Sequence, residues 1–117
     1  MESKDRAYKF SINIIKLIDS LPKELAAQTI ARQLLRAATS IGANIIEAQA
    51  SPTRKDFANF FNHSLKSANE AKYWLQLLRD SGKCDHELAN TLVIEATEIA
   101  NILGSSLLTL RGKRPDL

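Results

Sequence analysis

The sequence has very few of the residues that build disulfide scaffolds and metal sites. Cys84 is the only cysteine, and His63 and His86 are the only histidines. A single cysteine excludes an intrachain disulfide, and a structural zinc site would lack its usual ligands. This usage fits a reducing compartment, so we expect a cytoplasmic protein.

We also expect no targeting segment and no membrane-spanning segment. The first ten residues are rich in charge and contain no apolar stretch of the kind a secretory signal needs. No uninterrupted apolar run approaches the ~20 residues that cross a bilayer. We therefore expect no membrane partner.

The amino-acid composition is typical of a globular protein, and we expect one domain covering residues 1–117. Hydrophobic residues make up 44% and charged residues 25% of the 117 residues. The formal net charge is +3, and Arg111, Lys113 and Arg114 against Asp116 supply +2 of it, which leaves about +1 for the rest. So small a charge does not by itself indicate nucleic-acid binding.

Proline and glycine divide the chain into four segments with helical periodicity. Pro22, Pro52 and Gly82 fall between the segments, and Gly112 follows the last. Proline favours the first helical turn and glycine the residue past a helix end, while Ser51 and Asp85 are suitable N-caps. We predict helices at about 4–20, 22–49, 52–81 and 85–111, followed by a basic tail at 111–117.

Each segment repeats apolar residues every three or four positions, and none alternates with the period of two that a strand needs. Short joints place neighbouring helices antiparallel. The sequence therefore predicts an all-α, antiparallel up-down-up-down four-helix bundle. Gly42 and Gly104 lie inside predicted helices, where close helix approach would explain them.

A polar seam runs beside the core stripe of the second helix. At 100° per residue its members fall within about 80° of one another: Gln33, Arg36, Ser40, Asn44 and Glu47. The third helix has a counterpart in Phe60, His63, Ser67, Glu70 and Trp74. Single charges spaced by amides and hydroxyls are typical of a partly buried network. We predict that Arg36, Glu47 and Glu70 form one, completed by Ser40, Asn44 and Ser67.

The same residues carry a resemblance to a known family. The run from Gln33 to Ala48, Lys55-Asp56-Phe57, Phe60-Phe61, Ser67 to Glu70 and Leu21-Pro22-Lys23 closely resemble the bacterial four-helix-bundle proteins encoded in intervening sequences of large-subunit ribosomal RNA genes. The match departs at Ala48-Gln49, where glycine is expected after the glutamate. The chain is more distantly similar to the accessory variability proteins of diversity-generating retroelements, which are basic, pentameric and bind nucleic acid and a reverse transcriptase.

What the resemblance implies is a ring-like homo-oligomer with a pentamer as the expected assembly, and it implies no activity. Apolar residues outside the four core stripes favour association as well, because one small bundle cannot easily hide them. They are Leu35, Ile46, Leu77, Val93, Ile94, Ile102 and Leu108.

The chemistry of an enzyme is hard to assemble from this sequence. No glycine-rich loop follows a strand, Cys84 has no evident base, and the Glu-x-x-His motifs of di-iron bundles are absent. We expect no catalysis, no cofactor or metal, and no small-molecule substrate. The aromatic residues Phe57, Phe60, Phe61 and Trp74 are expected in the core or at a subunit contact.

One face of the third helix is a candidate nucleic-acid contact, because it lacks acidic residues and combines cations, amides and a phenol. It comprises Lys55, Asn59, Asn62, Lys66, Asn69 and Tyr73, to which the tail adds Arg111, Lys113 and Arg114. An ordinary solvated face is the alternative. Two functions thus stay open: an oligomeric scaffold whose partner is nucleic acid or an RNA-bound protein, and a structural or protein-interaction module without nucleic-acid affinity.

Overall fold

The computed structural model describes residues 2–112 of the chain and the side chains of residues 3–110. This part is all-helical, with four helices and no strand: α1 (Glu2–Asp19), α2 (Leu25–Gln49), α3 (Arg54–Asp80) and α4 (His86–Gly112). The predicted fold class is therefore confirmed as a bundle of four helices. The boundaries agree within three residues of those expected, and the largest difference is the later beginning of α2.

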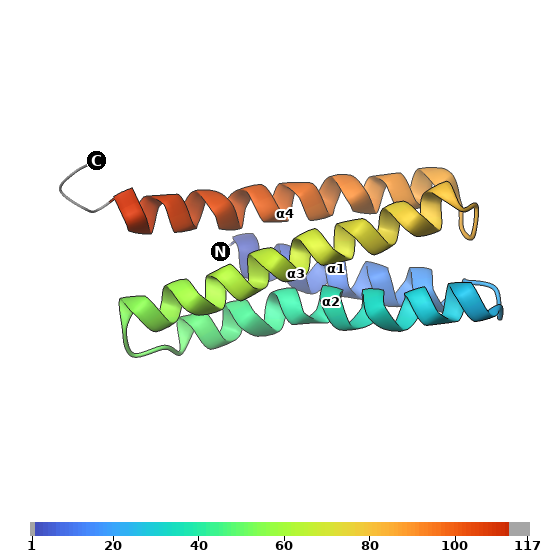
Figure 1. The fold of residues 1–117 in the computed structure, drawn as a ribbon. Helices are drawn as coiled ribbons and strands as arrows, with labels where there is room; N and C mark the ends of the chain where they lie inside the picture. Colours follow the sequence, from blue (N-terminus) through green and yellow to red (C-terminus); the bar gives the residue numbers. More distant parts are fainter. Residues whose placement is uncertain (1, 113–117) are drawn as a thin grey trace.

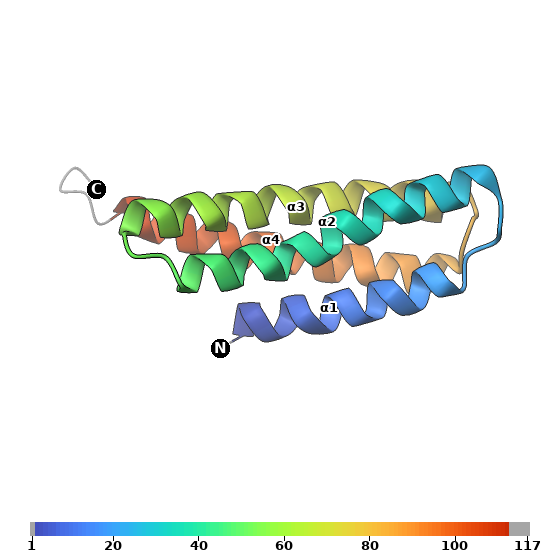
Figure 2. The same cartoon turned by 90° about the horizontal axis from the view of Figure 1, so that it is seen from below.

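The helices surround one core in the order of the chain. α1 packs on α2, α2 on α3 and α3 on α4, and α4 also contacts α1. The α1–α2 and α3–α4 joints lie at one end of the bundle, while the α2–α3 joint lies at the other (Figures 1 and 2). At that second end α4 extends past the beginning of α1, because α1 has only 18 residues against 27 in α4.

The core consists of the predicted stripes with few exceptions. Phe10, Ile14, Leu34, Leu75 and the other stripe residues are almost fully buried. Two residues that the apolar spacing placed in the stripes are exposed instead, Leu88 at 44% and Ile15 at 43%. Val93 is wrong in the opposite direction: we expected it on the surface and it is 8% exposed, in contact with the core.

Of the two predicted N-caps, Asp85 and Ser51, one is confirmed and one is wrong. Asp85 does cap α4, since its carboxylate accepts from the Leu88 amide at 2.9 Å. Ser51 does not cap α3: Thr53 takes that position and its hydroxyl accepts from the Asp56 amide at 3.1 Å. The Ser51 hydroxyl instead donates to the Glu47 carbonyl, so Ser51 and Pro52 belong to the joint.

Glycine explains one joint and one close helix contact. Gly82 has φ of +71° and ends α3 with paired bonds, from the Lys83 amide to Leu78 O at 3.0 Å and from its own amide to Arg79 O at 3.2 Å. A Cβ added to Gly42 would lie 3.6 Å from the Ala7 Cβ, so close approach of α1 and α2 is confirmed there. For Gly104 the explanation is wrong, because nothing lies within 4 Å of such a Cβ.

Helix α4 is the most apolar of the four. By length and composition alone its segment His86–Leu110 meets the test for a membrane span, with a mean hydropathy of 1.3 over its best window, which we did not expect from the sequence. Only 39% of that window is buried inside the chain. The core helix of a soluble protein meets the same test, and Glu95 and Glu98 bind Arg6 of α1.

Candidate functional site

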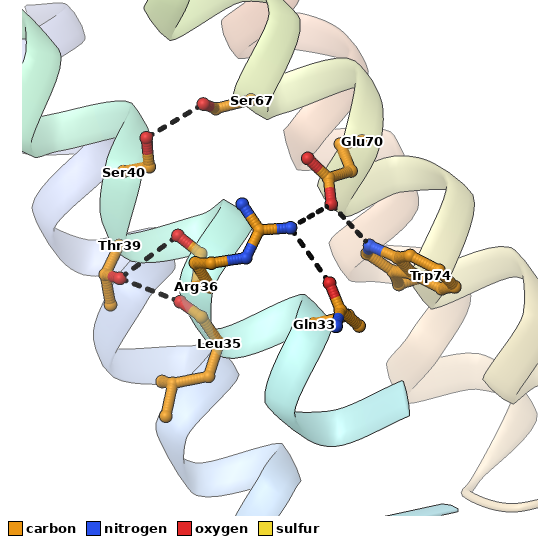
Figure 3. Close-up of polar contacts among 8 residues, drawn as sticks. All are labelled: Gln33, Leu35, Arg36, Thr39, Ser40, Ser67, Glu70 and Trp74. Carbon is orange, nitrogen blue, oxygen red and sulfur yellow. Dashed lines mark hydrogen bonds and ion pairs between the residues drawn. The ribbon is translucent and has the colours of Figure 1, made fainter. Parts of the chain in front are cut away.

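The polar seam joins α2 to α3, and its charged members meet around one carboxylate (Figure 3). Nη2 of Arg36 donates to Oε2 of Glu70 at 2.7 Å and to Oε1 of Gln33 at 2.9 Å. The indole Nε1 of Trp74 donates to the same Oε2 at 3.0 Å. Gln33 and Arg36 face Glu70 and Trp74 because a spacing of three or four residues keeps side chains on one helix face.

The hydroxyl members form a second group one turn along the helices. The Ser40 and Ser67 hydroxyls are 2.9 Å apart across the two helices, and the Asn44 amide donates to Ser40 Oγ at 2.9 Å and to Ser40 O at 2.8 Å. Deeper still, Ser64 is fully buried and its hydroxyl donates to Ile41 O at 2.8 Å. Small residues here let α2 and α3 approach closely.

The structure corrects the predicted network in two respects. Glu47 is exposed, and its carboxylate hydrogen-bonds to none of the other predicted members, so the contacts join the other five and Gln33 of the seam in two separate groups. The charged pair is also less buried than expected, since the side chain of Arg36 is 62% exposed and that of Glu70 35%. Solvent screens such a pair, so its contribution to stability is small.

The candidate nucleic-acid residues of α3 lie along one face of the helix, and most of them are exposed. Lys55, Asn59, Lys66, Asn69 and Tyr73 are exposed, and the Tyr73 ring meets Trp74 edge-on with centroids 5.0 Å apart. Asn62 is half-buried and lines a hollow of about 430 Å³ between α3 and α4, beside Gly104 and Leu108. The side chain of Arg111, and Lys113 and Arg114 altogether, lie outside the described residues.

The titratable groups that sequence analysis set aside are at the surface or inert. His63 and His86 are both exposed. Burial raises the pKa of the half-buried Cys84 thiol above its ordinary value, and the charge of Asp85 adds to this, so the thiol is protonated at neutral pH. Among residues 2–112 no three His, Cys, Asp or Glu side chains gather in a way that suits a metal ion.

Sequence reasoning missed an ion-pair cluster between the first and last helices. Arg6 donates through Nε to Glu95 at 2.9 Å and through Nη2 to Glu95 at 2.7 Å, and it also contacts Glu98. These bonds raise the pKa of Arg6 further above its ordinary range, so it stays charged. The signal was present, because Glu95 and Glu98 are spaced by three beside the core stripe of α4.

A second hollow, between α1 and α2, was also missed. It measures about 290 Å³, and Tyr8, Thr39, Gly42, Ala43 and Ile46 are among its lining residues. Tyr8 is 70% and Ile46 49% exposed, so its rim is apolar and open to solvent.

Comparison with known proteins agrees with this architecture. A family model described as 23S rRNA-intervening sequence protein matches residues 1–105. No curated protein matches the chain. The crystal structure of a Bacteroides thetaiotaomicron protein, with unknown function and from the S23 ribosomal protein family, is similar, with a TM-score of 0.84 and 38% identity over 90% of this chain and 97% of that one. Since the family model spans most of the sequence, the chain belongs to the 23S rRNA-intervening sequence protein family.

Proposed function

We propose that this protein is a non-enzymatic scaffold that works in the cytoplasm as a closed homo-oligomer, with a ring of five copies as the expected assembly. Each copy is an antiparallel up-down-up-down bundle. The position of the joints at alternate ends of the helices supports that order (Figures 1 and 2).

The observation that carries the proposal is the apolar surface that the filled core leaves uncovered. Large hydrophobic side chains remain exposed on α1 and α2 (Tyr8 at 70%, Ile46 at 49%) and on α4 (Ile94 at 52%, Leu108 at 68%). Monomeric soluble proteins rarely expose extended apolar patches, and a contact between copies removes them from water. Leu35 and Leu77, also predicted outside the core, are 38% and 37% exposed.

A role without catalysis is supported by what lines the hollows. One hollow, of about 570 Å³, lies between α3 and the end of α4, and Phe57, Ile102 and Leu110 share its lining with uncharged polar residues. Such a surface suits packing, since an enzyme site combines a pocket with convergent titratable groups.

Nucleic acid is the second candidate partner, because α3 carries a net positive charge. Arg54, Lys55, Lys66, Lys72 and Arg79 against three acidic residues give this helix a net charge of +2, and Lys55 and Lys66 are exposed. Repeating that helix around a ring multiplies the cations available to a phosphate backbone. The contact would be electrostatic and weak in sequence preference, with Tyr73 available to stack on a base.

Sedimentation velocity of the purified protein tests the scaffold. We expect a species several times the 13.0 kDa mass of one chain. A single species at the monomer mass, over the concentrations at which the protein is soluble, refutes the oligomer and with it the scaffold.

Nucleic-acid binding is tested with a duplex and a single strand, each at low and at physiological salt. We expect binding that falls steeply with salt, by roughly 0.9 log units of affinity per duplex phosphate contact for each log unit of salt. The Lys55→Glu, Lys66→Glu double variant should lose it, while a Lys9→Glu, Lys16→Glu variant with the same charge change on α1 should keep most of it. Absence of binding at low salt leaves the scaffold without nucleic-acid affinity.

A further inference from the structure

We propose that the hollow between α1 and α2 is the acceptor for helix α4 of a second copy, with Ile94 as the side chain that enters it. The inference rests on the proposed oligomer and names the two surfaces that form its contact. Four independent features of the described residues lead to it.

The first feature is the spacing of the residues on the α2 side of the hollow. Thr39, Gly42, Ala43 and Ile46 follow one another as i, i+3, i+4 and i+7. Four residues at that spacing form the diamond-shaped hole that receives one side chain of a facing helix in knobs-into-holes packing. A glycine in the middle makes the hole deeper. The volume, about 290 Å³, is at the lower bound of ligand pockets, ~300 Å³, and suits an inserted side chain.

The second feature is the absence of such a side chain within the described part of the chain. The Ala7 Cβ, at 3.6 Å from the position of an added Gly42 Cβ, packs against Gly42 from α1 and is itself fully buried. Ala43 and Thr39 are exposed, and Ile46 is half-exposed. Among the described residues no side chain fills the hole, which leaves it open to one from a second copy.

The third feature is height along the bundle. The Arg6–Glu95 ion pair places the beginning of α1 beside residue 95 of α4, and the Ala7–Gly42 contact places it beside residue 42 of α2. Ile94 and Gly42 are thus at nearly the same height. Rotation about an axis parallel to the helices preserves height, so a ring of such bundles brings Ile94 of one copy level with the hole of the next.

The fourth feature is charge. Glu87, Glu95 and Glu98 against Arg111 give α4 a net charge of −2, of which Arg6 of the same copy offsets one, whereas α2 carries +1. In the up-down-up-down order α2 and α4 run the same way, so Glu87, seven residues before Ile94, meets the set of residues seven before the hole, which includes Arg32 and Arg36. The surface around the hole on α2 is basic, so an acidic helix is the better partner for it. Helix α4 is acidic, whereas α3 has a net charge of +2 and would be repelled.

This pairing joins two different surfaces, and that property makes a sharp test. A hole-blocked variant, Ala43→Arg, keeps its α4 intact, and a knob-blocked variant, Ile94→Arg, keeps its hole. Each alone should sediment at the monomer mass of 13.0 kDa, while an equimolar mixture should form a 1:1 dimer of about 26 kDa, because one good contact per pair is restored. Both positions are exposed, so both variants should give the wild-type circular dichroism spectrum. If Ala43→Arg does not give that spectrum, Ile46→Lys takes its place as the hole-blocked variant.

Thr29→Arg on α2 and Thr109→Arg on α4 are matched controls, since both positions are exposed and lie away from the contact: Thr29 is 14 residues before Ala43, and Thr109 is 15 residues past Ile94, beyond the level at which α2 ends. They should retain the wild-type mass. If the wild type is oligomeric but either blocked variant keeps that mass, or if the mixture stays monomeric, the pairing of α4 with the α1–α2 hole is wrong. A monomeric wild type would instead refute the oligomer itself.

Discussion

The ion pair between Arg36 and Glu70 should contribute little to stability, although it lies at the centre of the seam. Its Nη2–Oε2 distance is 2.7 Å, which is good geometry, but the two side chains are 62% and 35% exposed. Were the pair buried, loss of one partner would cost about 3–5 kcal/mol. At the observed exposure the expected coupling is about 0.2–1 kcal/mol. For a domain of this size about 1 kcal/mol corresponds to a change in Tm of about 4 °C.

A double-mutant cycle measures that coupling without counting the other bonds of Glu70. Glu70→Gln keeps an acceptor for the Trp74 indole, and Arg36→Met keeps the apolar stem of the arginine. Urea unfolding of the four proteins, at one protein concentration and at low and high salt, gives the coupling free energy and its screening. A coupling above about 2 kcal/mol, or one that salt does not reduce, would show that the pair is shielded from solvent and that the reasoning from exposure fails.

Two further predictions concern local backbone features. Thr53→Ala should lower the free energy of unfolding by about 1 kcal/mol through loss of the α3 cap, while Ser51→Ala should change it by much less, as urea unfolding can measure. Gly104→Ala should raise the free energy of unfolding by about 0.4–1 kcal/mol, since the added Cβ meets nothing within 4 Å, and Gly82→Ala should lower it because φ there is +71°.

The fold could be predicted because each helix follows the same simple rules. Apolar spacing placed Phe10, Leu34, Leu75 and Leu103 in the core, and burial bears this out for each. Leu88 failed because the first turn of α4 faces the core through Ala89, which is fully buried, and Leu88 lies about 100° from it around the helix. Helix ends were less secure, since Ser51 and Thr53 both satisfy the composition of a cap and only tertiary position selects between them.

The seam was predicted as a set of residues and not as a geometry. Angular position alone brought Arg36, Glu70, Ser40 and Ser67 to the α2–α3 contact, and the structure joins them in two groups. How deeply a long side chain is buried depends on the distance between helices and on its rotamer, which a helical wheel does not contain. That is why Arg36 was expected to be buried and why Glu47, one turn too far along α2, was included.

The surfaces formed by two neighbouring helices could not be predicted from the sequence. Both the proposed contact between copies and the proposed nucleic-acid contact depend on such surfaces. The hole on α2 needs α1 beside it, and the height of Ile94 follows only from the Arg6–Glu95 pair. If α4 docks as proposed, the −1 that remains on α4 after pairing with Arg6 of its own copy faces the +1 of α2 on the neighbouring copy, and the two cancel at the contact. The charge that remains in each copy is then mainly the +2 of α3. Ring closure would therefore turn a weakly basic chain into an assembly whose unpaired charge is concentrated on the helix that carries Lys55 and Lys66, which is the condition that counterion release requires.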